Sequence, residues 1–409
     1  MTVTPLVEQL ADPCVIVGLL LYVPFALWPL LALARSPDPW RIGWTGVALV
    51  AGLVVLLQRF TDTPPFVYPD VPVTMGVMAQ DRPPWLWLWL EQRTIAGAGW
   101  NALPWYLFNR ATGTYLGERV VGLFWYAVLV LAVGASAPRR GVPLALAFLF
   151  TPPVLWLSRH AMGTEILAQQ VALLAALDRL RRGRLWFAPL AGLLTGALQY
   201  TYVAARVVVL YPALWLWKRP LRALVVYLVF ALAWAPMWAV ARRTNQAPPL
   251  RALPGKTDLW TPLTLGKVRA SFGSLFKTPV PGSWGAFSYP GAQTIPRTAW
   301  AAVAGGALFG GWRYLPAAFL GLAPDLVGPG GGVSHRQMMV HVPLLFVASS
   351  GLARLPRLVT GAVSVAVAAE GISIWLGESF WRRAVELRPP PGGFYPCATP
   401  EPPRWCPGA

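Results

Sequence analysis

Charged residues are scarce in this 409-residue chain, and acidic residues are the scarcest. Only 12% of the residues are charged, and 16 Asp and Glu stand against 34 Lys and Arg. Because a soluble domain carries about 25% charged residues, this composition argues against a soluble protein. The chain also contains only three Cys and three His, and none of them has the spacing of a zinc site. We therefore expect no metal and no other cofactor.

Apolar residues are correspondingly abundant. They make up 56% of the chain, the mean hydropathy is +0.51, and 22 residues are Trp. Apolar runs of roughly 17 to 21 residues recur, and about 20 helical residues cross a bilayer. We therefore predict an all-α integral membrane protein, a polytopic bundle of about twelve helices. The predicted spans are 14–34, 42–58, 115–134, 141–157, 164–180, 185–202, 203–217, 223–241, 298–312, 314–328, 339–353 and 358–376.

The short turns between these spans are rich in Arg and predict the orientation. Basic residues cluster at 35–41, 139–140, 179–184, 218–222, 313 and 354–357, which all fall on one side. Short basic loops face the cytoplasm, so we place these turns there. The other side then holds both termini and the long connections 59–114 and 242–297. We expect a multi-pass protein of the cytoplasmic (inner) membrane whose functional site faces outward.

The chain divides into a transmembrane region, 1–376, and a Pro-rich outer tail, 377–409. In the first outer loop the run 85–90 alternates Trp with Leu and is too short to span, so we expect interfacial helices there. The second loop is basic and contains interleaved aromatic residues. It is either a lid over an anion or an unstructured connector. Cys397 and Cys406 lie in the tail, where oxidising conditions would permit a disulfide.

Two carboxylates and several arginines fall on the predicted outer side. Asp70 follows Tyr68 and Pro69 just after an apolar segment, and Glu165 begins the span 164–180. Ionisable residues at membrane depth are costly and therefore candidates for function, although residues at the edge also extend into water. The outer arginines either anchor lipid headgroups or bind a phosphate. No segment resembles a nucleic-acid-binding fold, so we expect no nucleic acid partner.

The order of several motifs resembles a known superfamily. An apolar span, a Pro and aromatic approach to Asp70, and the string GERVVG at 117–122 look like the amino-terminal half of the GT-C glycosyltransferases. The strings WLSR at 156–159, Glu165 heading a helix that ends in RLRRGR at 179–184, and GALQYTY at 196–202 continue the likeness. The later landmarks are Ala235-Pro236, Arg242-Arg243 and His335-Arg336. Residues 45–355 are together similar to bacterial protein O-mannosyltransferases and lipid A aminoarabinose transferases.

This resemblance implies a GT-C-like fold and a hexosyl or pentosyl transferase that uses a polyprenyl-phosphate-linked sugar. Asp70 and Glu165 would be the catalytic carboxylates, with Asp70 as the base for an acceptor hydroxyl. The donor phosphate would be bound by arginines, and the substrate pocket would contain aromatic side chains and a histidine. The implied phosphate-binding residues are Arg159, Arg206, Arg243 and Arg336, and the implied pocket residues are Tyr68, Tyr200, Tyr202 and His335. The acceptor would be a hydroxyl of a protein, lipid or glycan.

Two departures from the family pattern bear on this prediction. Family members usually place a second acidic residue beside the first-loop Asp, whereas this chain has Val71 there. One carboxylate at that position would then act alone. No folded soluble domain is expected after residue 376, which argues against an oligosaccharyltransferase. The alternative function is a polytopic transporter or flippase for an anionic lipid or lipid-linked sugar, with outer basic residues steering the cargo.

Overall fold

The structure, a computed structural model, describes most of the helical core. The described residues are 5–35, 37–58, 60, 78, 88, 99–114, 116–159, 161–243, 262–277, 293–328 and 334–377, and only the backbone is described at 99, 161, 162, 203, 334 and 335. These residues are almost entirely helical, and the described parts contain no β-strand beyond one isolated bridge between Lys277 and Gln293. The predicted all-α class is confirmed at this level.

The helices follow one another with short connections wherever the chain is described. In chain order they are α1 (Leu6–Ala11), α2 (Pro13–Leu20), α3 (Tyr22–Arg35), α4 (Pro39–Leu57), α7 (Gly99–Thr112), α8 (Gly117–Ser136), η1 (Arg139–Gly141), α9 (Val142–Ala147), η2 (Phe148–Phe150), α10 (Pro152–Leu157), α11 (Ala161–Arg181), α12 (Phe187–Gln199), η3 (Val203–Leu210), α13 (Tyr211–Leu216), α14 (Pro220–Arg243), α15 (Leu265–Ser274), α16 (Arg297–Leu308), η5 (Gly311–Tyr314), α17 (Leu315–Val327), η6 (Ser334–Gln337), α18 (Met338–Leu352) and α19 (Arg357–Leu376).

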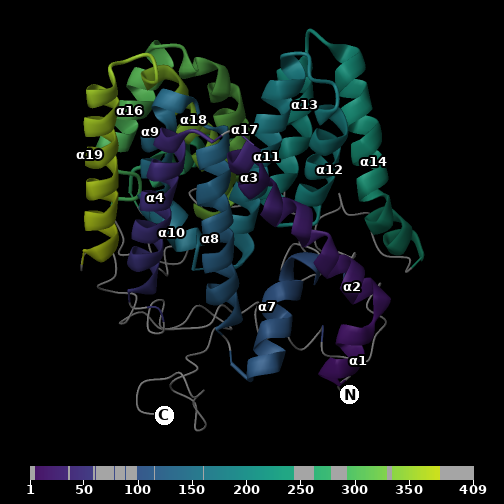
Figure 1. The fold of residues 1–409 in the computed structure, drawn as a ribbon. Coiled ribbons are helices and arrows are strands. Elements are labelled where there is room, and N and C mark those ends of the chain that lie inside the picture. Colours follow the sequence, from purple (N-terminus) through teal and green to yellow (C-terminus); the bar gives the residue numbers. More distant parts are fainter. Residues whose placement is uncertain are drawn as a thin grey trace, which may run out of the picture.

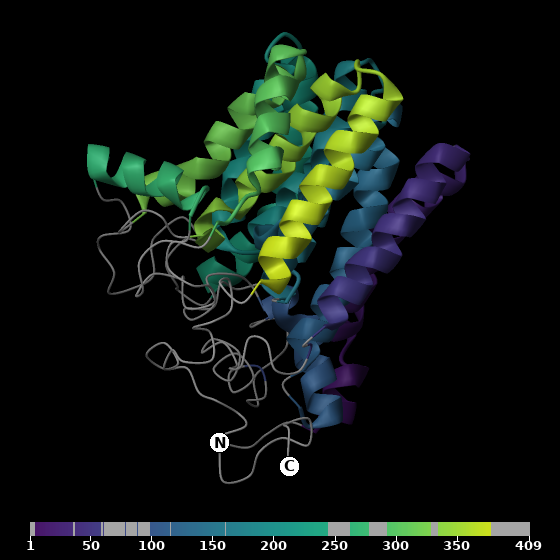
Figure 2. The ribbon, with the colours of Figure 1, turned by 90° about the vertical axis from the view of Figure 1, so that its left-hand side faces the viewer.

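The long helices form a bundle, and α1 and α7 lie beyond one end of it (Figures 1 and 2). Figure 1 shows the turns from α13 to α14 and from α18 to α19 at the opposite end. Among the described residues, five helical stretches are long and apolar enough to cross a membrane: Pro13–Arg35, Pro39–Leu57, Gly117–Ser136, Pro220–Arg243 and Arg357–Leu376. These helices are those expected of a membrane protein. The count of twelve spans stays a prediction.

The structure divides two of the predicted spans into shorter helical segments. The range 141–157 consists of η1, α9, η2 and α10, and the range 203–217 consists of η3 and α13. Thr151 is extended, with ψ of 141°, directly before the helix that begins at Pro152. A residue before proline disfavours the helical conformation, so the helix restarts at the proline.

The α11 helix is the central helix of the bundle and packs against α8, α12, α13 and α18. It is not among the five apolar stretches, because the buried polar residues Glu165, Gln169 and Gln170 lower its hydropathy. Their side chains are at most 2% exposed. Polar residues inside a membrane bundle face its interior rather than lipid, as these residues do.

Gln170 satisfies a carbonyl that its own helix cannot satisfy. Proline has no backbone N–H, so Pro343 within α18 leaves the Met339 carbonyl without its usual helical donor. Gln170 Nε2 donates to the Met339 carbonyl at 2.8 Å and to the Tyr211 hydroxyl at 2.8 Å. This side chain therefore links α11 to α13 and to the beginning of α18.

The α7 helix of the first long loop packs tightly on the amino-terminal helices. The Trp100 ring stacks on Tyr22 at 4.6 Å, and its Nε1 donates to the Gly18 carbonyl at 2.8 Å. Burial raises the pKa of Tyr106, so its hydroxyl stays protonated and donates to Gln9 Oε1 at 2.7 Å. The predicted interfacial location of this helix stays a prediction, but its docking on α2 and α3 is clear.

The described parts of the second long loop are held against the bundle by hydrogen bonds. Gln337 Nε2 donates to Ser274 Oγ of α15 at 2.7 Å and to Asp325 Oδ2 of α17 at 2.7 Å. Where the loop ends, Glu370 of α19 accepts from the backbone N–H groups of Arg297 and Thr298, both at 2.9 Å. A carboxylate at a helix N-terminus satisfies N–H groups that have no partner within the helix, so Glu370 caps α16.

Candidate functional site

Two buried arginines hold the chain where the first long loop begins. Arg159 follows α10 and is 1% exposed, and its Nη2 donates to the Gln58 carbonyl at 2.5 Å. Arg119 of α8 donates through Nη1 to the Phe60 carbonyl. The Arg159 guanidinium also lies 5.7 Å from the centroid of the Phe60 ring, within the range of a cation–π contact. The two guanidinium groups thus hold Gln58 and Phe60, which directly follow α4.

A glycine on α8 permits the close approach of the segment that carries Arg159. A Cβ atom at Gly122 would lie 2.2 Å from the Ser158 carbonyl oxygen and 3.1 Å from its carbonyl carbon. These are backbone atoms, so a larger residue at this position would displace the turn from α10 to α11. Gly122 is the last residue of the string GERVVG at 117–122, and in the structure it allows α8 and the Ser158 backbone to lie in contact.

Glu165 lies in the first turns of α11 and is 1% exposed. Gln169 Nε2, one helical turn later, donates to its Oε1 at 2.7 Å. Within the described residues no ion pair to Glu165 is seen, and an ionised carboxylate buried without a cation is costly. Such a carboxylate is a candidate for function rather than for stability.

Two of the three tyrosines predicted for the pocket, Tyr200 and Tyr202, directly follow α12. Tyr200 is buried, and its hydroxyl donates to the Ala233 carbonyl of α14 at 2.9 Å. Its ring lies 6.3 Å from Trp100, so Trp100 connects Tyr200 to Tyr22. Tyr202 is partly buried and precedes η3. The structure therefore links Tyr200 to Tyr22 through Trp100, and α7, which carries Trp100, contacts α11, which carries Glu165.

The remaining predicted arginines fall on three elements. Arg206 is on η3 and Arg336 is on η6, and these two elements contact each other. The Arg336 guanidinium packs over the end of α17, where a Cβ at Gly328 would lie 2.6 Å from Nη1. A cation is favourable at the C-terminus of a helix. Arg243 is the last residue of α14 and is exposed.

Several predicted residues lie outside what the structure describes. Asp70, Tyr68, Cys397 and Cys406 are outside the described ranges, as is most of both long loops. For His335 only the backbone, on η6, is described. The roles of Asp70 as base and of these residues in the pocket, and a disulfide in the tail, stay predictions.

Four buried residues to which the sequence assigns no role hold the segments of this region together. Arg119 and Gln170 hold neighbouring segments, and Asp325 and Gln337 join the end of α17 to η6. Asp325 is a lone polar residue in an apolar stretch, and Gln170 belongs to a polar group with Glu165 and Gln169 within one; these are the signals that could have identified them. Their partners could not have been identified, because each contact joins distant parts of the chain.

The described residues contain no group of three His, Cys, Asp or Glu side chains able to hold a metal ion. His341 lies on α18 beside a small apolar cavity that also contains Thr151 and Leu167. That cavity is lined by α8, η2, α10, α11, α18 and Ile295, and its lining includes none of the predicted site residues.

Comparisons with protein-family models, with curated proteins and with solved structures find no match to this chain.

Proposed function

We propose that this protein is a membrane glycosyltransferase of the GT-C type, with about twelve transmembrane helices. It would move a sugar from a polyprenyl-phosphate donor to a hydroxyl acceptor on the extracytoplasmic side. The observation that carries the proposal is the turn from α10 to α11. It places the buried cation Arg159 and the buried carboxylate Glu165 close together in sequence, beside the start of the loop that carries Asp70.

The proposed chemistry is a single displacement. The acceptor oxygen attacks the anomeric carbon, the bond between that carbon and the phosphate oxygen breaks, and polyprenyl monophosphate leaves. The acceptor proton passes to a carboxylate, for which Asp70 is the candidate base. Arginines suit the departing phosphate, because a guanidinium stays charged and binds two oxygens at once. One displacement inverts the configuration at the sugar.

The contact between η3 and η6 supports this assignment, because it brings together the elements that carry Arg206 and Arg336. Gln170, through the Met339 carbonyl, and Gln337, through Asp325, anchor the junction of η6 with α18. A preorganised cation is more effective in stabilising a leaving phosphate than a mobile one, because no reorganisation is needed during the reaction.

The test is transfer of labelled sugar from a polyprenyl-phosphate donor by the purified protein in proteoliposomes. We expect Glu165→Gln and Asp70→Asn each to lower the rate at least about 100-fold, the lower end of what acid–base groups contribute. Glu8→Gln is the matched control, because Glu8 is an exposed carboxylate on α1, which lies at the end of the bundle where α7 also lies (Figure 1). Turnover of both carboxylate variants at the rate of the Glu8 variant would remove the catalytic assignment.

A further inference from the structure

Two neighbouring turns form a basic patch at the end of the bundle opposite α7. One turn connects α11 to α12, and the other connects α13 to α14. Arg222 Nη1 donates to the Leu180 carbonyl at 2.7 Å, which joins the two turns. We call this surface the basic patch, and its members are Arg179, Arg181, Arg182, Arg184, Lys218, Arg219 and Arg222.

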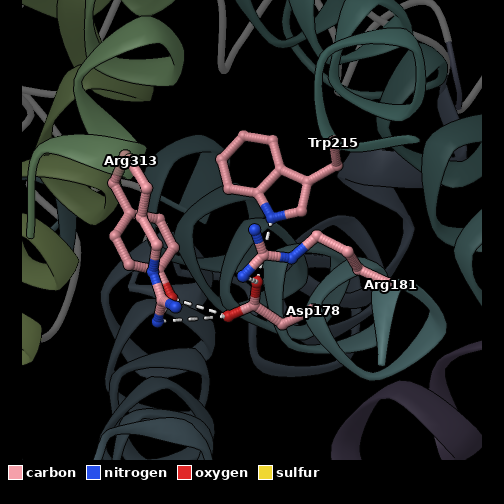
Figure 3. Close-up of polar contacts among 5 residues, drawn as sticks. Asp178, Arg181, Trp215 and Arg313 are labelled. Carbon is pink, nitrogen blue, oxygen red and sulfur yellow. Dashed lines mark hydrogen bonds and ion pairs between the residues drawn. The ribbon is translucent and has the colours of Figure 1, made fainter. Parts of the chain in front are cut away.

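The negative charge within the basic patch is already engaged. Asp178 accepts from Trp215 Nε1 at 3.0 Å and from the Tyr314 hydroxyl at 2.6 Å, and the Arg313 guanidinium lies 3.8 Å from it (Figure 3). Arg181 lies at 4.0 Å, at the limit of an ion pair. Asp178 thus serves to join α11, α13 and η5, and it does not neutralise the patch.

The basic residues repel one another. Arg182 and Arg184 are exposed and follow Arg179 within five residues, so the like charges of these guanidinium groups oppose one another. The helices α12 and α14 also begin at this surface, so their N-termini add partial positive charge. A surface with this much unbalanced charge favours a bound anion.

Exposed tryptophans beside the arginines indicate that the bound anion is the phosphate of a lipid. Trp186 is 64% exposed, Trp217 is 72% exposed, and Leu185 between the arginines and Trp186 is 60% exposed. Lys218 Nζ lies 4.8 Å from the centroid of the Trp217 ring. Tryptophan is enriched at the level of lipid headgroups, where its ring is half in the apolar phase. A basic residue and a Trp at the same depth are suited to a phosphate that is itself attached to a lipid.

We propose that the basic patch binds the phosphodiester headgroups of anionic phospholipids in the leaflet opposite α7. The inference is independent of the proposed transferase activity. It rests on the seven cations, the engaged Asp178, the two helix N-termini and the exposed Trp186 and Trp217.

The test measures thermal unfolding of the full chain in a neutral detergent as phosphatidylglycerol or phosphatidylcholine is titrated. The patch variant is Arg182→Gln with Arg184→Gln and Arg219→Gln. The control variant removes the same charge from exposed residues of other turns on the same face, as Arg35→Gln with Arg140→Gln and Arg354→Gln. Inorganic phosphate is titrated in parallel, to separate a lipid headgroup from a free anion.

We expect phosphatidylglycerol to raise the unfolding temperature of the wild type more than phosphatidylcholine does. At about 1 kcal/mol per basic residue near a surface, the patch variant should need roughly 100-fold more phosphatidylglycerol for the same shift. The control variant, whose three arginines lie on three separate turns, should lose less than the patch variant. Equal losses in both variants, no loss in the patch variant, or an equal shift with inorganic phosphate would each overturn the proposal.

Discussion

Replacing Gln170 by Leu should destabilise the bundle, because it leaves the buried Met339 carbonyl without a hydrogen-bond donor. The side chain is fully buried and donates to both the Met339 carbonyl and the Tyr211 hydroxyl at 2.8 Å. Tyr211 keeps a second, longer contact, since its hydroxyl lies 3.4 Å from the Ala317 carbonyl. The Met339 carbonyl loses its donor, because Pro343 cannot supply one. A buried polar group left without a partner costs about 1–3 kcal/mol, and that is the expected loss.

Two further variants make this prediction specific. Pro343→Ala restores an N–H opposite the Met339 carbonyl, so combining it with Gln170→Leu should recover much of the loss. Gln199→Leu is the matched control, because Gln199 is also buried but, among the described residues, donates to the Thr195 carbonyl within its own helix and to no other element. The control should cost less than about 1 kcal/mol.

The assay is the fraction of monomeric protein that survives heating in detergent, measured over a temperature series. The reasoning fails if Gln170→Leu and Gln199→Leu lower the midpoint equally. It also fails if Pro343→Ala leaves the cost of Gln170→Leu unchanged, since the two effects would then be independent.

Two other substitutions follow from single contacts. Gly122→Ala should cost about 1–3 kcal/mol in the same assay, since a Cβ there meets the Ser158 backbone, and should weaken donor binding by displacing Arg159. Gly46→Ala, where nothing lies within 4 Å, is the control, and equal stability of the two variants would contradict the packing argument. Glu370→Gln should cost about 0.5–2 kcal/mol by weakening the cap of α16, and unchanged stability would show that the N-terminus of α16 does not need it.

The helices could be predicted from the sequence because the bilayer imposes a length on apolar runs. The apolar stretch that ends at Arg35 and the one that begins at Arg357 lie on helices at those places. The breaks within 141–157 were missed, although Pro143 and Pro152 signal them, because an apolar run of the right length outweighed its prolines.

The site could be predicted only in part. Glu165 and Arg159 were identifiable as polar residues bordering apolar runs, and the structure finds both buried. Their surroundings were not identifiable. The contacts of Arg159 with Gln58 and of Glu370 with Thr298 join residues far apart in the chain, and no local pattern specifies such pairs.

The most direct measurement is the fate of the donor in sealed proteoliposomes that contain the protein, a doubly labelled polyprenyl-phosphate sugar and an acceptor. A transferase releases one polyprenyl monophosphate for each sugar that appears on the acceptor, and Asp70→Asn abolishes both together. Movement of the intact donor from one leaflet to the other, without release of polyprenyl monophosphate, would contradict the proposed reaction and identify a transporter.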